Sequence, residues 1–328
     1  MKKIIIMIII FTIFCSCNKN KLKKVTKENF YFNTYIQITV YNENKNIALD
    51  AINKAFTEIE RIDNFYNSYK KDSSIYKLNE NKQIVVDEEL KYILSEIEKI
   101  YRLTEGNYDI TIKPLIELWE NSVNNNKRIP NSEEISEILG NIDFSKVVID
   151  EKNILKIGKN QRINTGSFLK GYAIKNAKKI LKENGINSGL ITAVSSIETI
   201  NGKNNNENWN IAIENPNNQN VILKTLSLNN KAVGVSGDYQ NYYEVNGNKY
   251  HHILDVNTGF PINDKKMVVV IAEDSFIADI YSTALFTLEI DKILKIINNI
   301  DNIEVLVVDN LDNIYMSEKF CKFIKLNE

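Results

Sequence analysis

The chain has few of the residues that build disulfide-rich or metal-binding domains. Its 328 residues include 3 cysteines and 2 histidines. Two of the cysteines lie in an N-terminal segment that we expect to be processed, which would leave Cys321 alone. A disulfide framework and a cysteine-based metal site are therefore excluded. The fold must be stabilised by its hydrophobic core, for which the chain is long enough.

The chain also lacks an excess of charge of either sign. Its 41 basic and 42 acidic side chains leave a formal net charge of −1. No long-range field would attract nucleic acid, whereas a nucleotide ligand needs only a few well-placed donors and a metal ion. Heptads, short-period repeats and an interdomain linker are missing as well, so we expect one globular body.

The one long apolar run lies near the N-terminus. It covers residues 4–14 and ends at Cys15-Ser16-Cys17, which is the form of a secretory signal. The run is short for a membrane-spanning helix, which needs about 20 residues. Ser16-Cys17 resembles the end of a lipoprotein signal peptide over residues 1–17, so we predict lipidation of Cys17. An ordinary signal peptide or an uncleaved anchor is the alternative.

These features predict where the protein works. Residues 18–29 are polar and basic, and we expect them to form a flexible tether. The protein is then expected in the cell envelope, lipid-anchored to the membrane and facing the periplasm or the exterior.

Helical and strand periodicities alternate over the rest of the chain. The spacing of apolar residues predicts a strand over 34–41 and helices over 48–62, 88–103, 168–184 and 275–288. Further strands are expected at 146–150, 154–157, 189–194, 209–215, 223–228, 231–236, 267–273, 303–309 and 313–317. We therefore expect a mixed α+β body over residues 30–328.

Two segments have the residue types of a ligand site. In INTGSFLKGYAIKNA (163–177), the chain passes through Gly166 into a helix with Lys170 in its first turn. Free backbone N–H groups there favour a pyrophosphate, and a helix cap with a surface lysine is the alternative. In GNYDITIKPLIELW (106–119), Asp109 follows a helix end. Its carboxylate is expected to accept hydrogen bonds either from a ligand or from nearby backbone N–H groups.

The C-terminal half holds both histidines and a candidate metal site. His251 and His252 are adjacent in a strand-like stretch, so their side chains point to opposite faces. Asp279 and Thr283 are four residues apart and share one face of a helix. Their oxygens suit Mg²⁺, which takes few protein ligands together with waters and phosphate oxygens. An ordinary polar helix stripe is the alternative.

In their order and spacing, five segments resemble the ApbE flavin transferase family from about Phe32 to about Leu288. They are FNT (32–34), SYKKDSSIYKLN (68–79), the segments 106–119 and 163–177, and SGDYQNYYEVNGNKYHHILDVNTGFPIN (236–263) with FIADIYSTALF (276–286). The resemblance implies a T-fold-like α+β body with mainly antiparallel sheets packed with helices.

The resemblance also implies roles for particular residues. FAD contacts are expected from Phe32, Tyr69, Asn107, Tyr108, Asp109, Asn164, Lys170 and His252. Mg²⁺ ligands are expected to be Ser167, Asp279 and Thr283, and catalytic roles fall to Asp279, Lys170 and His252. A turn of Asp255, Thr258 and Gly259 would fix His252, which is expected to face the ligand.

Several residues depart from the family pattern. Phe32 and Asn33 stand in place of Met and Gly, Asn164 in place of Asp, Ser167 in place of Gly, and Val256 in place of Pro. Val194 and Ser195 stand at the glycine positions of an Asn-Ala-Gly-Gly-like turn. A backbone cannot approach a ligand as closely over Val as over Gly, so reduced or altered activity stays open.

The function that the resemblance implies is Mg²⁺-dependent transfer of FMN from FAD to a Thr or Ser hydroxyl of a target protein, with release of AMP. The partners would be FAD, the acceptor protein and the membrane, and not nucleic acid. Three alternatives remain. The first is a Mg²⁺-dependent FAD pyrophosphatase that yields FMN and AMP, and the second is a lipoprotein that binds FAD without chemistry. An unrelated surface lipoprotein is the third. The general base is unassigned.

Overall fold

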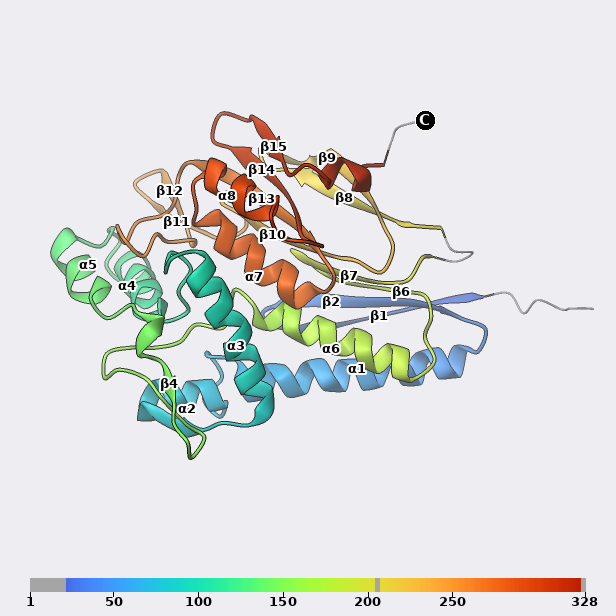
Figure 1. Ribbon diagram of the computed structural model, residues 1–328, viewed down its shortest axis with the longest axis horizontal. Coiled ribbons are helices and arrows are strands. Elements are labelled where there is room, and N and C mark those ends of the chain that lie inside the picture. The colour runs from blue at the N-terminus through green and yellow to red at the C-terminus, as the bar shows by residue number, and fades with distance from the viewer. Residues whose placement is uncertain (1–21, 204–206, 326–328) are drawn as a thin grey trace, which may run out of the picture.

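The computed structural model describes residues 22–203 and 207–325 (Figure 1). Within these residues, eight strands form one antiparallel sheet in the order β1-β2-β6-β7-β10-β13-β14-β15. Their bounds are Lys23–Tyr31, Thr34–Asn42, Gly189–Ala193, Ser196–Ile200, Ala232–Gly237, Lys265–Ala272, Glu304–Asp309 and Ile314–Met316. The expected α+β fold with mainly antiparallel sheets is confirmed.

Helices cover one face of this sheet, as Figure 1 shows. α1 (Lys45–Tyr66), α6 (Leu169–Glu183) and α7 (Ser275–Phe286) pack against it, and α3 (Glu88–Leu103) packs on α7. The buried residues of α3 recur every three or four positions, which is the spacing of one helix face. α7 differs from α3 in being buried on nearly every side, because it is enclosed by helices and strands together.

A hairpin covers part of the opposite face. It consists of β8 (Trp209–Asn215) and β9 (Asn218–Leu228), and the 3₁₀ helix Phe320–Phe323 packs beside it. In β8, buried and exposed residues alternate, because successive side chains of a strand point to opposite faces. The sheet is therefore covered on both faces, by helices on one and by a hairpin on the other.

A third hydrophobic cluster surrounds Trp119. It joins α4 (Lys113–Asn124) and α5 (Ser132–Leu139) to the hairpin of β11 (Tyr242–Val245) and β12 (Asn248–His251). The remaining elements are α2 (Ser74–Asn81), α8 (Ile290–Ile297), the 3₁₀ helix Phe144–Lys146, and a small sheet of β3 (Gln83–Val85), β5 (Ile154–Lys156) and β4 (Val148–Ile149). The Trp119 cluster holds the segment that carries His252 against α4 and α5.

Two glycines let α7 lie unusually close to its neighbours. A β carbon on Gly171 of α6 would lie 2.3 Å from the Ser275 carbonyl oxygen, and one on Gly234 of β10 would lie 2.3 Å from the Ala278 carbonyl oxygen. Both distances are far below van der Waals contact. The position of α7 is therefore fixed from two sides, at the level of Asp279.

The flexible tether expected over residues 18–29 is wrong from Lys23 onward. β1 pairs with β2 along its whole length, from Lys23 opposite Asn42 to Tyr31 opposite Thr34. β1 is an edge strand in which only Val25 is buried, so most of its residues are polar. It therefore shows almost none of the apolar alternation that predicts a strand.

The other N-terminal predictions fall outside the described residues. They are the signal peptide over residues 1–17, the lipidation of Cys17 and the start of the tether. In the part of the chain that the structure describes, no helix is both long and apolar enough to cross a membrane.

Candidate active site

A cavity of about 1330 Å³ lies where several elements meet. It is lined by residues of the β1–β2 turn, the start of α6, the β6–β7 turn, α7 and the segment before and after β11–β12. All of the predicted site residues line it: Phe32, Tyr69, Asn107, Tyr108, Asp109, Asn164, Ser167, Lys170, His252, Asp279 and Thr283. The fold thus brings the five sequence segments together around one space.

Asp279 is a buried carboxylate of this cavity, and it is 7% exposed. The Ser196 hydroxyl lies 2.6 and 2.7 Å from its two oxygens, and the Gly171 N–H in the first turn of α6 also donates to it. Burial raises the pKa of the Asp279 carboxyl to about 6, although the Lys170 ammonium and these donors lower it. The carboxylate of α7 therefore meets the start of α6, as the metal and phosphate assignment requires.

Lys170 provides the positive charge opposite Asp279. Its Nζ donates to Ser195 Oγ at 2.5 Å and to the Ala193 carbonyl oxygen at 3.4 Å. Burial lowers the pKa of the Lys170 ammonium, and the charge of Asp279 raises it. The alternative of a solvated surface lysine does not hold, because Lys170 lines the cavity and its acceptors lie at the end of β6 and in the β6–β7 turn.

The loop before α6 presents hydroxyls and amides to the cavity. Ser167 Oγ lies 2.8 Å from the Tyr108 hydroxyl oxygen, so two of the predicted residues contact each other directly. Asn164 is buried, and its Oδ1 accepts the Gly166 N–H at 2.7 Å. Asn164 therefore stabilises the loop. The Ser167 hydroxyl, near the start of the helix, is able either to donate or to accept a hydrogen bond.

Thr283 follows Asp279 by one helical turn. Its Oγ1 lies 3.1 Å from Ser236 Oγ, which also lies 3.0 Å from Ser282 Oγ. Ser236 comes from β10, the strand that packs directly on α7. Hydroxyl groups from strand and helix thus surround the space beside the carboxylate.

The two histidines have the opposite orientations that their adjacency predicts. His251 is buried, with Nε2 2.5 Å from the Ile262 carbonyl oxygen and Nδ1 accepting the Ile253 N–H at 3.2 Å. His252 lines the cavity, and its Nδ1 lies 2.9 Å from the Asn241 carbonyl oxygen. A carbonyl only accepts, so Nδ1 carries the proton and Nε2 keeps a lone pair.

Burial and the charge of Lys170 both lower the pKa of His252. Its imidazole is therefore neutral at physiological pH, and Nε2 is able to take up a proton.

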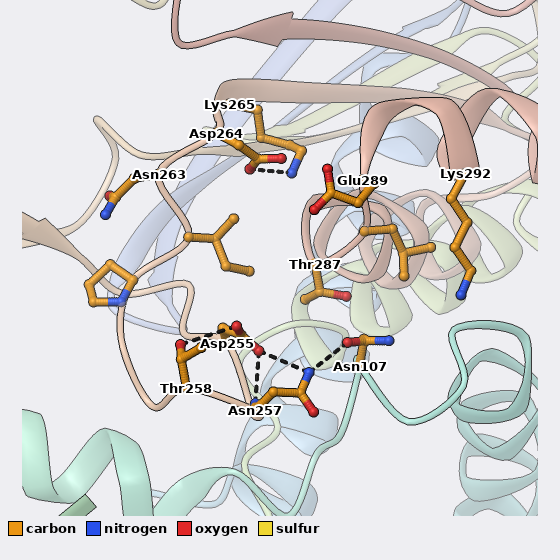
Figure 2. A pocket seen from close by; sticks show the side chains of 13 residues that line it. Asn107, Asp255, Asn257, Thr258, Asn263, Asp264, Lys265, Thr287, Glu289 and Lys292 are labelled. Atoms are coloured by element: carbon orange, nitrogen blue, oxygen red, sulfur yellow. Dashed lines mark hydrogen bonds and ion pairs between the residues drawn. The ribbon is translucent and has the colours of Figure 1, made fainter. Parts of the chain in front are cut away.

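A turn after the histidines fixes this segment (Figure 2). Asp255 accepts the Asn257 N–H at 2.8 Å and the Thr258 hydroxyl at 3.1 Å, and Asn257 donates to Asn107 Oδ1 at 2.8 Å. The Trp119 indole N–H donates to the Gly259 carbonyl oxygen at 2.9 Å. The turn lines a second, smaller cavity of about 410 Å³, and Asn107 lies between the two cavities.

The Asp109 carboxylate accepts hydrogen bonds from nearby backbone N–H groups, which is one of the two roles expected from the sequence. Its oxygens accept the Thr111 N–H and hydroxyl, both at 2.7 Å, and the Phe144 N–H at 2.7 Å. It is 6% exposed. Asp109 therefore stabilises the loop that carries Tyr108, and its contact with FAD stays a prediction.

Three cavity-lining residues other than glycine have the left-handed backbone that glycine favours. Phe32, Asn33 and Val194 have left-handed backbones, with φ of 52°, 57° and 49°. The first two form the tight β1–β2 turn, where the family pattern has a glycine at position 33. Val194 keeps the backbone shape of the glycine it replaces, and its side chain is 78% exposed at the cavity rim.

The structure shows contacts of three serines to which the sequence analysis assigned no role. Ser195, Ser196 and Ser236 contact Lys170, Asp279 and Thr283 across 25, 83 and 47 residues of chain. Serine is common and these serines follow no recognised spacing, so no local signal predicted these contacts. Within the described residues, no group of three or more His, Cys, Asp or Glu side chains forms a metal cluster.

The fold and this cavity define a nucleotide-sized site that contains the buried Asp279 carboxylate, the half-buried Lys170 and several hydroxyl groups. The ApbE family model matches residues 32–307. The chain therefore belongs to the ApbE family.

Relatives and solved structures agree with this assignment. The FAD:protein FMN transferase of Haemophilus influenzae is 28% identical over 304 residues, which cover 89% of this chain and 86% of that protein. The FAD:protein FMN transferase of Buchnera aphidicola is 29% identical over 334 residues, covering 97% and 95%. The crystal structure of the ApbE protein from Thermotoga maritima superposes with a TM-score of 0.86 and 28% identity, covering 93% of this chain and 100% of that chain.

Proposed function

We propose that this protein is an FAD:protein FMN transferase. It would transfer FMN from FAD to a Thr or Ser hydroxyl of a target protein and release AMP. The observation that carries the proposal is the meeting of the Asp279 carboxylate with the first turn of α6, inside a cavity large enough for a dinucleotide. The relatives that cover most of this chain have this activity in their names.

The oxygens of the site fit Mg²⁺. One carboxylate, from Asp279, and the hydroxyl groups of Ser167 and Thr283 line one cavity, and hard oxygen ligands in small number are what Mg²⁺ takes from a protein. The buried carboxylate also has a raised pKa, which a bound cation would lower again. Bound there, Mg²⁺ would neutralise charge on the pyrophosphate oxygens.

Different side chains would then serve different parts of the reaction. The oxygen of the target hydroxyl forms a bond to the FMN phosphorus, and the bond from that phosphorus to the bridging oxygen breaks, so that AMP leaves with the electron pair. His252 Nε2 has the lone pair to take the proton of the attacking hydroxyl. Lys170 provides fixed positive charge beside the phosphates, and positioning of this kind accounts for most catalysis of phosphoryl transfer.

The aromatic residues of the cavity suit the two rings of FAD. Tyr69 and Phe32 line the wall, and the buried Tyr108 is held by its bond to Ser167. Aromatic contacts of this type are worth about 0.5–1.5 kcal/mol beyond the buried area.

The envelope location is a separate proposal. We infer that Cys17 is lipidated and tethers the enzyme to the membrane, on the basis of the apolar run and Ser16-Cys17. Mass spectrometry of the protein purified from membranes tests it. An unmodified Cys17 would remove the anchor and leave the enzymatic proposal intact.

The activity is tested with the full protein, FAD, MgCl₂ and an unmodified acceptor domain of the kind that carries FMN on threonine. Transfer gives flavin fluorescence on the denatured acceptor, a mass gain of one FMN moiety, and AMP in equal amount. Asp279→Ala is expected to abolish it, and Asp72→Ala, which removes an exposed carboxylate, serves as the control. Free FMN without acceptor labelling would favour the pyrophosphatase, and bound FAD without turnover would favour a binding protein.

A further inference from the structure

Tyr69 lines the main cavity with a ring that is held from two directions. Its hydroxyl oxygen accepts a hydrogen bond from Asn164 Nδ2 at 3.1 Å. The Lys113 ammonium nitrogen lies 3.7 Å from the centroid of its ring. The Tyr69 side chain is 51% exposed and Lys113 is 5% exposed, so the ring separates the buried ammonium from the cavity. A cation at this distance from a ring face is attracted by the ring quadrupole.

The position of Lys113 is unfavourable for the helix that contains it. Lys113 is the first residue of α4, where the helix dipole disfavours a positive charge. Burial lowers the pKa of its ammonium. In the described part of the chain its ion pair is with Glu117, at 3.5 Å, and Glu117 is also bound by Arg162 at 2.9 Å. Glu120 also favours the charged form of Lys113. Burying a cation at a helix start is nevertheless unfavourable, so we expect the Tyr69 ring to contribute to holding this ammonium.

We propose that Lys113 is a positioning residue, whose ammonium, together with the Asn164 amide, fixes the Tyr69 ring as a platform for one flat ring of FAD. The inference rests on the proposed function, which supplies FAD as the ligand. The stacked group is the isoalloxazine or the adenine, which present the same chemistry to Tyr69. Asn164 also accepts the Gly166 N–H at 2.7 Å, so the orientation of the platform is tied to the loop before α6.

The energetic reason is preorganisation. An exposed tyrosine ring samples several orientations and loses this freedom when a ligand stacks on it. A ring that is already ordered by two contacts loses less, so the ligand binds more tightly. Lys113 would then act on the affinity for FAD and not on the chemical step.

The test is the dissociation constant of FAD, measured by quenching of flavin fluorescence. Lys113→Met keeps the length of the side chain and removes the charge, and it is expected to weaken binding about three- to tenfold. Lys113→Arg keeps the cation and is expected to bind within about twofold of the wild type. In the transfer assay, Lys113→Met is expected to raise KM for FAD and to leave kcat unchanged.

Lys175→Met is the matched control, since it removes an ammonium 5.2 Å from the Tyr92 ring, outside this cavity. Thermal unfolding of each variant reports whether it is folded. Lys113→Met is then repeated in a Tyr69→Ala background, where it is expected to have no further effect on binding. Binding of FMN and of ADP is measured separately, since FMN contains the isoalloxazine and ADP the adenine. The ligand whose affinity falls in Lys113→Met contains the ring that stacks on Tyr69.

Three outcomes would overturn the inference. The first is a folded Lys113→Met variant that binds FAD as the wild type does. The second is an equal loss of affinity with and without Tyr69, because Lys113 would then act by another route. The third is a wild-type protein that does not bind FAD at all, which would overturn the proposed function as well.

Discussion

Gly171 and Asp279 are so close that a β carbon on Gly171 would lie 2.8 Å from Asp279 Oδ2. The glycine belongs to the first turn of α6 and the aspartate to the middle of α7. Their proximity lets the Gly171 N–H donate to the buried carboxylate. The contact between the two helices therefore sets the position of the candidate metal ligand.

Gly171→Ala tests this relationship. The added methyl would meet the Ser275 carbonyl at 2.3 Å as well as Asp279, so α7 must move. We expect a loss of about 2 kcal/mol in the free energy of unfolding and little or no FMN transfer. Gly140→Ala is the control, because no atom lies within 4 Å of its β carbon. Wild-type transfer by Gly171→Ala would contradict the assignment of Asp279.

Ser196 supplies the side-chain hydroxyl that donates to Asp279. Ser196→Ala leaves the buried carboxylate without this donor, and a hydrogen bond to a charged group contributes about 1.5–3 kcal/mol. We expect the rate of FMN transfer to fall roughly 10- to 100-fold.

The neighbouring variant Ser195→Ala distinguishes the two serines. It removes one of the two acceptors of Lys170 and leaves the contact between Ser196 and Asp279 in place. The rate is therefore expected to fall less than in Ser196→Ala. Steady-state transfer rates at several Mg²⁺ concentrations check both variants, and an equal effect of the two would contradict this account.

His251 predicts a loss of stability in acid. Burial lowers its pKa from 6.5 to about 4, against the hydrogen bond to the Ile262 carbonyl that raises it. Between these values the unfolded chain binds a proton at this histidine and the folded protein does not, so stability falls as the pH falls. The expected loss from pH 7 to pH 4 is roughly 3 kcal/mol.

Urea unfolding at a series of pH values measures this effect, with His251→Gln as the comparison. The variant is expected to be less stable at pH 7 and to lose less stability as the pH falls. The two curves should therefore converge toward pH 4. Parallel curves would show that His251 is not the group responsible.

Val194→Gly is expected to stabilise the protein. Val194 has a φ of 49° and an exposed side chain. Its backbone is therefore strained, and packing of its side chain does not offset this strain. Glycine relieves the strain but raises the conformational entropy of the unfolded chain. The expected net increase in the free energy of unfolding is about 0.5–1 kcal/mol.

Val85→Gly serves as the matched control. Val85 lies in β3 and is 76% exposed, so the same substitution there should destabilise the protein. Chemical denaturation of both variants checks the difference in sign. A destabilised Val194→Gly would mean that the left-handed backbone at Val194 is not strained.

Much of this protein was predictable from its sequence by itself. The apolar spacing predicted α3 with its actual bounds, Glu88–Leu103, and predicted β2, α6 and α7 to within a few residues. The pairing of Asp279 with Thr283 on one face, and the opposite orientations of the two histidines, follow from helix and strand geometry alone. These are local properties, because residues a few positions apart decide them.

Tertiary structure decided the rest. β1 is a strand because β2 offers it a complete row of partners, although its own residues are mostly polar. Asp109 binds the backbone of Phe144, Ser196 approaches Asp279, and Lys113 lies on Tyr69, across 35, 83 and 44 residues of chain (113 − 69 = 44). No periodicity encodes such contacts, because they depend on how distant elements pack, and packing is a property of the folded chain as a whole.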